Sequence, residues 1–190
     1  MNVIETRIPD LLIFEPRIFS DERGWFMESF NQTVFNDELT KRNLVIPNFV
    51  QDNHSCSKKG VLRGLHYQLD PYAQGKLVRV VQGRAWDVAV DIRKGSTTFG
   101  QWVGVELNTE NHRQFWIPAG FAHGFIALEN DTHFLYKTTN FYNKESERSI
   151  AYNDETLAID WQLNEEEFKL TEKDREGLSL KEAIETSSIF

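Results

Sequence analysis

Short apolar runs recur along the whole chain, and this rhythm restricts the possible folds more than any other feature of the sequence. The runs are NVIETRI, LLIFEPRIF, GWFMESF, NFVQDNH, VLRGLHY, KLVRVVQ, WDVAVDI, QWVGVEL, RQFWIPA, HGFIALE and HFLYKTT. Gly, Pro, Asn, Asp or Ser separates them at intervals of about a dozen residues. This spacing is typical of an antiparallel sandwich or barrel, so we predict a mainly β protein.

The length and composition of the chain indicate one folding unit. With 190 residues and 40% hydrophobic side chains, it can bury a core, and it shows no repeat or low-complexity linker. We therefore predict a single domain over residues 1–190, partly helical in its charge-rich segment from about 164 to 190. Two helices are expected: 32–42 after a cap at Asn31, and 179–186, where Ser179 and Glu182 have capping-box spacing.

Two consecutive runs, 76–81 and 86–91, are joined at Gln82-Gly83-Arg84. This arrangement predicts a β-hairpin in which Gly83 takes the positive-φ position. Side chains alternate between the two faces of a strand. In the second run we therefore expect Asp87, Ala89 and Asp91 on one face, opposite Trp86, Val88 and Val90.

The charge and cysteine content restrict partners and compartment. A formal net charge of −8 and a pI near 5.2 argue against a nucleic-acid or anionic-membrane surface, which needs clustered Lys and Arg. A bound anion would require a local basic patch.

The single cysteine, Cys56, excludes an intrachain disulfide and a thiolate-cluster zinc site. No segment resembles a signal peptide or a membrane span, so we expect a cytoplasmic protein.

The segment GVLRGLHYQ, residues 60–68, carries two ionisable side chains in an otherwise half-buried strand pattern. Arg63 and His66 are three residues apart, so a regular strand would direct them to opposite faces. Gly64 between them permits a bulge that directs both to the same face. The alternative for His66 is an ordinary hydrogen-bonded core histidine.

Other polar residues allow both structural and functional interpretations. Lys76 at the start of an apolar run is either a charged residue protecting a sheet edge or a cation pointing into a pocket. Tyr136 is either a core tyrosine or a functional one, and residues 170–177 taken alone resemble a solvated charge run. The five histidines, 54, 66, 112, 123 and 133, show no local metal-binding spacing.

Several segments, in this order, closely resemble the dTDP-4-dehydrorhamnose 3,5-epimerases, from about residue 2 to residue 176. They are DERGWFMESFN (21–31), FVQDNHSCSKKGVLRGLHYQ (49–68), QGKLVRVVQGRAWDVAVDIRKGSTTFGQWVGVEL (74–107), RQFWIPAGFAHGF (113–125), FLYKTTNFY (134–142), NDE and IDW. The resemblance implies a cupin-type jelly roll with a few flanking helices, and a homodimer that exchanges N-terminal strands. It also implies catalysis without metal or cofactor.

The implied substrate is a dTDP-4-keto-6-deoxy sugar. The implied reaction converts dTDP-4-dehydro-6-deoxy-D-glucose to dTDP-4-dehydro-L-rhamnose in dTDP-L-rhamnose biosynthesis. By resemblance His66 is the general base, Asp174 the carboxylate that orients it, Tyr136 the acid on the opposite side of the sugar, and Lys76 a cation near the keto group. The implied substrate-binding residues are Arg23, Glu28, Gln51, Asn53, Arg63, His123, Tyr142, Glu147 and Lys173.

These residue types suit the reaction. Inverting a carbon beside a ketone removes a proton from one face and returns one to the other, through an enolate. A histidine base, a tyrosine acid and a lysine near the enolate oxygen form a minimal set. Three alternatives remain open: a mono-epimerase acting at carbon 3 or carbon 5 only, a cupin ketoisomerase, and a sugar-nucleotide binding protein without catalysis.

Overall fold

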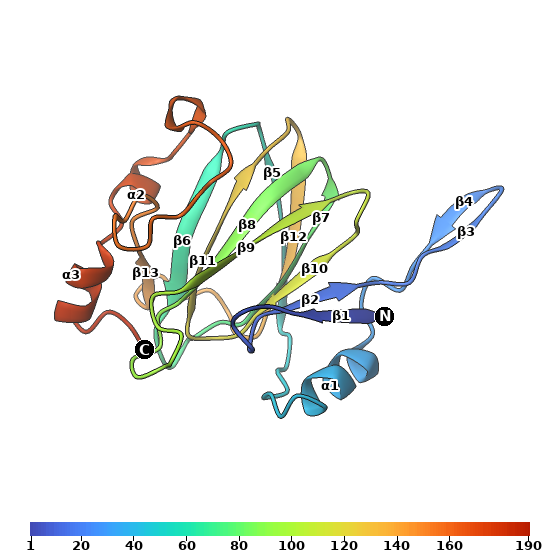
Figure 1. Ribbon diagram of the computed structural model, residues 1–190, viewed down its shortest axis with the longest axis horizontal. Helices are drawn as coiled ribbons and strands as arrows, with labels where there is room; N and C mark the ends of the chain where they lie inside the picture. The colour runs from blue at the N-terminus through green and yellow to red at the C-terminus, as the bar shows by residue number, and fades with distance from the viewer.

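Two antiparallel sheets make up most of the computed structural model, which describes residues 1–190 (Figure 1). The 6-stranded sheet has the order β1 (Asn2–Glu5), β2 (Leu12–Glu15), β10 (Gln114–Ile117), β7 (Lys76–Gln82), β12 (Thr132–Thr138), β5 (Gln51–Ser57). The 5-stranded sheet has the order β13 (Glu147–Ser149), β6 (Leu62–Gln68), β11 (Phe121–Ala127), β8 (Arg84–Asp91), β9 (Trp102–Asn108). From β5 to β13 the chain changes sheet at every connection except β8 to β9. The predicted mainly β jelly roll is confirmed.

The predicted hairpin between residues 76–81 and 86–91 is wrong. β7 lies between β10 and β12 in one sheet, whereas β8 lies between β11 and β9 in the other. Gly83 has a φ of +76° as expected, and an added Cβ would lie 2.6 Å from Thr132 Oγ1. The turn carries the chain from one sheet to the facing sheet. A positive φ at Gly83 suits this connection as well as it suits a hairpin turn, so the glycine alone does not distinguish them.

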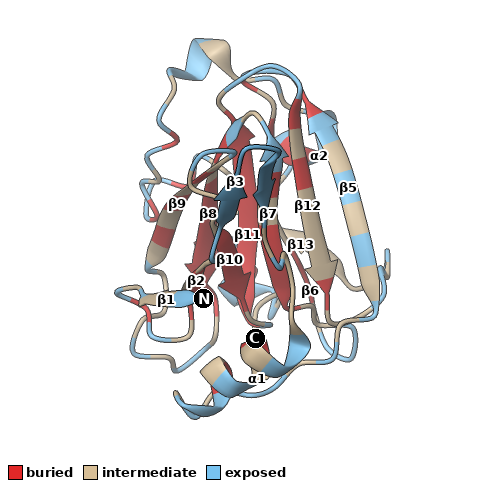
Figure 2. Cartoon of the chain, turned by 90° about the vertical axis from the view of Figure 1, so that its right-hand side faces the viewer, coloured by how far each residue is buried: buried red, intermediate tan, exposed pale blue.

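The main core lies between the two sheets and gives β8 two different faces (Figure 2). Ala85 and Ala89 pack in this core, while Val88 and Val90 pack on the outer face beneath the C-terminal segment. The alternation predicted for this strand is therefore confirmed. The inner face also carries Asp87, a fully buried carboxylate.

The C-terminal segment covers the outer face of the 5-stranded sheet. It contains η1 (Glu165–Glu167), α2 (Glu172–Arg175) and α3 (Leu180–Glu185), and Figure 1 shows α2 and α3 beside β6 and β13. The expected C-terminal helix is confirmed as α3, with Ser179 and Glu182 forming the capping box. The first expected helix is α1 (Gln32–Thr40), which ends two residues early. Asn31 caps it, accepting a hydrogen bond from the Val34 amide.

A short hairpin stands apart from the sandwich. β3 (Phe19–Asp21) and β4 (Gly24–Phe26) pair only with each other and project away from both sheets (Figure 1). The hairpin exposes large apolar side chains: Phe19 is 48% exposed, Trp25 57% and Phe26 64%. Exposed apolar side chains grouped in this way are typical of a surface that contacts another molecule.

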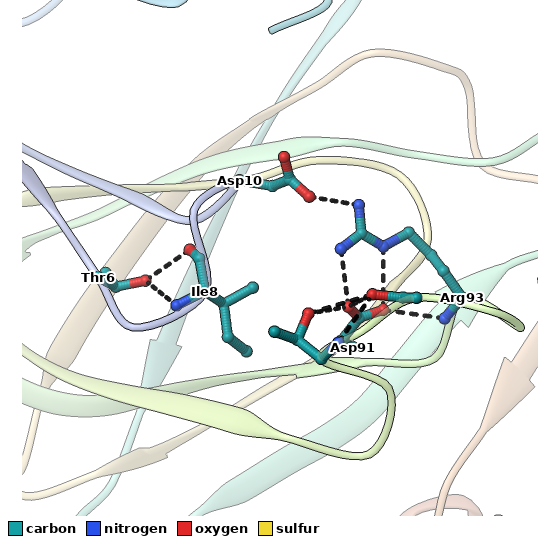
Figure 3. A network of polar contacts seen from close by, with 7 residues as sticks. Thr6, Ile8, Asp10, Asp91 and Arg93 are labelled. Atoms are coloured by element: carbon teal, nitrogen blue, oxygen red, sulfur yellow. Dashed lines mark hydrogen bonds and ion pairs between the residues drawn. The ribbon is translucent and has the colours of Figure 1, made fainter. Parts of the chain in front are cut away.

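An ion-pair network fixes the loop that follows β8 (Figure 3). Arg93 pairs with both Asp91 and Asp10, which ties the turn between β1 and β2 to the end of β8. Burial would raise the pKa of Asp91, but hydrogen bonds from Arg93, Ser96 and Thr98 outweigh it and lower that pKa. The Arg93 guanidinium also lies over the Phe121 ring, 4.5 Å from its centre, at the start of β11.

No helix of this fold is long and apolar enough to span a membrane.

Candidate active site

A cavity of about 470 Å³ brings together most of the predicted site residues. It is lined by both sheets and by the C-terminal segment. The predicted residues in its wall are Gln51, Asn53, Arg63, His66, Lys76, His123, Tyr136, Tyr142, Glu147, Lys173 and Asp174. Arg23 and Glu28 are absent from it.

A bulge in β6 places Arg63 and His66 in the same cavity wall. The pairing of β11 with β6 shifts register here: His123 lies opposite His66, and Phe125 lies opposite Arg63. β6 therefore contains one residue more than β11 between these pairs. Gly64 has a φ of +135°, and an added Cβ would lie 2.5 Å from Gly124 Cα. The predicted role of Gly64 is confirmed.

His66 is paired with Asp174. His66 Nε2 lies 2.9 Å from Asp174 Oδ1, and the Asp174 side chain is only 4% exposed. Asp174 Oδ1 also accepts a hydrogen bond from the Gly64 amide at 3.1 Å, and Oδ2 accepts one from the Thr171 hydroxyl. Burial would raise the pKa of Asp174, but these interactions outweigh it and lower the pKa to about 2. The interpretation of this segment as a fully solvated charge run is therefore wrong for Asp174.

Lys76 is buried in the cavity wall rather than at a sheet edge. It lies on β7, in the middle of the 6-stranded sheet, and is 8% exposed. Its Nζ donates a hydrogen bond to the His66 carbonyl oxygen at 3.3 Å. Burial lowers the pKa of Lys76 to about 8, against the opposing effect of Asp87. The edge interpretation of this lysine is wrong, because local sequence does not show which strands flank β7.

A second His–Asp pair lies beside the first. His123 Nε2 is 2.8 Å from Asp87 Oδ2, and both side chains are almost completely buried. Burial raises the pKa of Asp87 and lowers that of His123. Asp87 was not among the predicted site residues. The available signal was an acidic residue on the core face of an otherwise apolar strand.

Tyr136 lies on β12 and is half-buried within the cavity. Its ring centre is 6.2 Å from that of the buried Phe134. Burial raises the pKa of Tyr136, although the Arg63 charge opposes this shift. The phenol is therefore protonated at neutral pH and can serve as a proton donor.

Polar and aromatic residues continue the site toward solvent. Glu147 accepts a hydrogen bond from the Tyr142 hydroxyl at 2.9 Å and forms an ion pair with Lys173 at 2.5 Å. Tyr142 is 56% exposed. Elsewhere in the wall, Gln51 Nε2 donates to Asn53 Oδ1 at 2.9 Å. The exposed ring and neighbouring hydrogen-bonding groups could contact a nucleotide.

Arg23 and Glu28 are not brought into the cavity of this chain. The Arg23 side chain is 85% exposed on the projecting hairpin and pairs with Asp21. Glu28 accepts a hydrogen bond from Asn31 at the start of α1. Their assignment to the substrate site stays a prediction.

The acidic, histidine and cysteine side chains form no group of three or more that could hold a metal ion. His66 and His123 are each engaged by a different aspartate. Independence from metals and cofactors stays a prediction.

Comparison with known proteins gives consistent similarities over nearly the whole chain. A family model described as dTDP-4-dehydrorhamnose 3,5-epimerase matches residues 5–182. The dTDP-4-dehydrorhamnose 3,5-epimerase of Shigella flexneri is 58% identical over 183 residues, which cover 96% of this chain and 98% of that protein.

Solved structures share the fold. The crystal structure of dTDP-6-deoxy-D-glucose-3,5-epimerase from Legionella pneumophila Philadelphia 1, in complex with dTDP-4-keto-L-rhamnose, matches with a TM-score of 0.92 at 53% identity, covering 99% of this chain and 96% of that one. A 3'-monoepimerase from Streptomyces bikiniensis, in complex with dTDP-quinovose, matches with a TM-score of 0.88 at 30% identity, covering 97% and 91%. The same architecture is therefore found with more than one epimerase specificity.

Proposed function

This chain belongs to the dTDP-4-dehydrorhamnose 3,5-epimerase family, and from this membership we propose that His66, Tyr136 and Lys76 carry out its proton transfers. The chain is an isomerase that inverts carbons 3 and 5 of dTDP-4-dehydro-6-deoxy-D-glucose, giving dTDP-4-dehydro-L-rhamnose for dTDP-L-rhamnose biosynthesis. The observation that carries the proposed mechanism is a single cavity containing a His–Asp pair, a buried lysine and a half-buried tyrosine.

His66 removes the proton from the carbon beside the ketone. Asp174 lies 2.9 Å from His66 Nε2, so it stabilises the imidazolium formed when the base takes the proton. Burial and three interactions keep Asp174 in place. The other ring nitrogen of His66 is left to accept the substrate proton.

Lys76 and Tyr136 complete the inversion. When the C–H proton leaves, negative charge develops on the keto oxygen, and the buried Lys76 ammonium stabilises that charge far better than a solvated lysine would. Tyr136 then donates its phenolic proton to the opposite face of the carbon. Exchange of the tyrosine and histidine protons with solvent restores both groups, and the sequence repeats at the second carbon.

Lys76 should make turnover sensitive to alkaline pH. Because burial lowers its pKa to about 8, the ammonium loses its proton as the pH rises through that value. We expect kcat to be sustained from neutral pH to about 8 and to decline above it, as measured by product formation across this range. In Lys76→Met the residual rate should be about 10²-fold lower and should lack this alkaline decline. The same alkaline decline in the variant would assign the titration to another group.

Arg63 is proposed to bind the diphosphate, because a guanidinium can donate two parallel hydrogen bonds to phosphate oxygens. Its Nε donates to Ser57 Oγ at 3.3 Å, which orients the side chain in the cavity wall. We expect Arg63→Ala to raise KM by about 10-fold or more with kcat within a few-fold of wild type. Steady-state kinetics, with the exposed Arg84→Ala as control, measure this. An unchanged KM with a collapsed kcat would instead place Arg63 in the chemistry.

We also propose a homodimer in which the β3–β4 hairpin reaches the partner subunit. Its exposed Phe19, Trp25 and Phe26 support this, because about half or more of each of these large apolar side chains stays uncovered in its own chain. The exchange would give Arg23 and Glu28 access to the second copy's cavity. Light scattering of the purified protein tests the proposal: a dimer is expected, and a monomer at micromolar concentration would contradict it.

The substrate class and compartment follow from the same proposals. The expected ligand is a dTDP-linked 4-keto-6-deoxy sugar, with Tyr142 stacking on the base and Glu147 and Lys173 nearby. The single cysteine, Cys56, supports a reducing, cytoplasmic compartment.

NMR in deuterated water tests the function directly. Purified enzyme is incubated with dTDP-4-keto-6-deoxyglucose, and deuterium is counted at carbons 3 and 5 of the product. We expect incorporation at both carbons. Incorporation at only one would favour a mono-epimerase, the activity of the 30% identical Streptomyces bikiniensis protein. No incorporation would contradict the proton-transfer mechanism.

A further inference from the structure

Asp154 is a buried carboxylate that the proposed mechanism does not use. It is 7% exposed and belongs to the segment between β13 and η1. Its Oδ1 accepts hydrogen bonds from the Thr156 and Leu157 amides, both at 2.9 Å. Its Oδ2 accepts one from the Leu180 amide at 2.7 Å, across 26 residues of sequence. Asp154 therefore joins the start of α3 to the segment that follows β13.

This connection bears on the active site because Asp174 lies on a single helical turn. α2 has only four residues, and an isolated turn of this length is not stable in water. Besides the contacts that Asp174 itself makes, the position of α2 therefore depends on the chain on either side. Upstream, Lys169 forms an isolated parallel β-bridge with Val61. The Leu62 amide donates a hydrogen bond to the Lys169 carbonyl, and the Lys169 amide donates one to the Gly60 carbonyl.

The downstream side of α2 is anchored to the strand that pairs with His66. The Leu178 amide donates to the Ser149 carbonyl at 3.0 Å, and the Ala151 amide donates to the Leu178 carbonyl at 2.8 Å. Ser149 is also the β13 residue opposite His66 in β6. The short strand β13 thus locates His66 directly and Asp174 through Leu178.

Two features hold this downstream anchor in place. Gly177 packs against the backbone after β13, where an added Cβ would lie 2.7 Å from both the Ala151 nitrogen and the Ile150 carbonyl carbon. Three residues further on, the Leu180 amide donates a hydrogen bond to Asp154, and the Leu180 side chain is buried in the outer core. Loss of either feature would free the downstream end of α2.

We propose that Asp154 and Gly177 are positioning residues that fix the distance between Asp174 and His66. They act from outside the cavity, through the Leu178 anchor. The proposal rests on the proposed role of Asp174 as the carboxylate that supports the base. On this view, residues from Gly177 onward help to position the catalytic side chains, although none of them lines the cavity.

A double-mutant cycle tests the proposal. In Asp154→Asn one side-chain oxygen becomes an amide, so the acceptors for all three backbone amides cannot be kept. We expect kcat to fall by about 10-fold or more, because small displacements of catalytic groups are costly, with KM and dTDP affinity unchanged. In an Asp174→Asn background, the same substitution should lower kcat less than twofold further. Gly177→Ala should behave in the same way and replaces Asp154→Asn if that variant does not fold.

Asp160→Asn is the matched control, since exposed Asp160 also accepts a backbone hydrogen bond, but from the nearby Gln162 amide rather than from α3. It should keep wild-type kcat. Wild-type kcat in Asp154→Asn would overturn the positioning role. So would an equal fold-decrease in kcat when Asp154→Asn is introduced into the wild-type protein and into Asp174→Asn. Wild-type kcat in Asp174→Asn alone would instead show that the proposed His66–Asp174 mechanism is wrong, and the positioning role with it.

Discussion

Substitution of His66 by alanine is expected to lower kcat by about 10⁴-fold, the upper range for loss of a general base. No neighbouring group can replace it: Lys76 donates a hydrogen bond to the His66 carbonyl, and His123 is held by Asp87. The His66 side chain is 26% exposed at the cavity wall, so its removal should leave the core intact. Product formation followed by NMR measures the loss.

The same experiment separates catalysis from binding. His66→Ala should keep dTDP affinity close to that of wild type, because the residues proposed to contact the diphosphate and the thymine ring are other ones. Deuterium exchange at carbons 3 and 5 of recovered substrate should also stop, since the first proton is no longer removed. His54→Ala is the matched control, because exposed His54 lies outside the cavity and hydrogen-bonds to His133. Activity of His66→Ala within a few-fold of wild type would remove His66 from the base role.

Substitution of Tyr136 by phenylalanine is expected to lower epimerisation by about 10³-fold, within the range for loss of a positioned acid. The burial that raises the pKa of Tyr136 keeps its proton available at neutral pH, and phenylalanine retains the ring but has no proton to give. Unlike His66→Ala, this variant still forms the enolate. The imidazolium of His66 can return a proton to the original face.

Isotope exchange therefore distinguishes the two variants. In deuterated water, Tyr136→Phe should incorporate deuterium into recovered substrate without inverting the carbon. Tyr152→Phe provides the control, since Tyr152 packs against Phe168 outside the cavity. Loss of both exchange and epimerisation in Tyr136→Phe would mean that Tyr136 is needed before the enolate forms. Full epimerisation would exclude it as the acid.

Local rules predicted much of the scaffold. The period-2 pattern of residues 86–91 correctly separated the core face of β8 from its outer face, because each side chain's direction depends only on its own strand. The caps at Asn31 and Ser179 were also correct, since a cap and its helix lie within a few residues of each other. Gly64 was recognised as a bulge for the same reason.

Errors arose where the answer depended on distant segments. The turn at Gly83 was assigned to a hairpin, although β7 and β8 belong to opposite sheets. Lys76 could not be placed at an edge or a centre until β10 and β12 were known to flank it. Asp87 gained its partner, His123, only through the pairing of β8 with β11.

The amino-acid sequence by itself determined the strands, the helix caps, the faces of β8, the bulge at Gly64 and, through resemblance, most of the residues of the cavity. These features depend on backbone preferences and motifs within short segments. Only the tertiary structure decided which sheet each strand joins, how deeply Lys76 is buried, and that Asp174 lies 2.9 Å from His66. Those properties come from contacts between residues far apart in sequence, where the order of strands, the exclusion of water and the resulting pKa shifts are set by the whole fold.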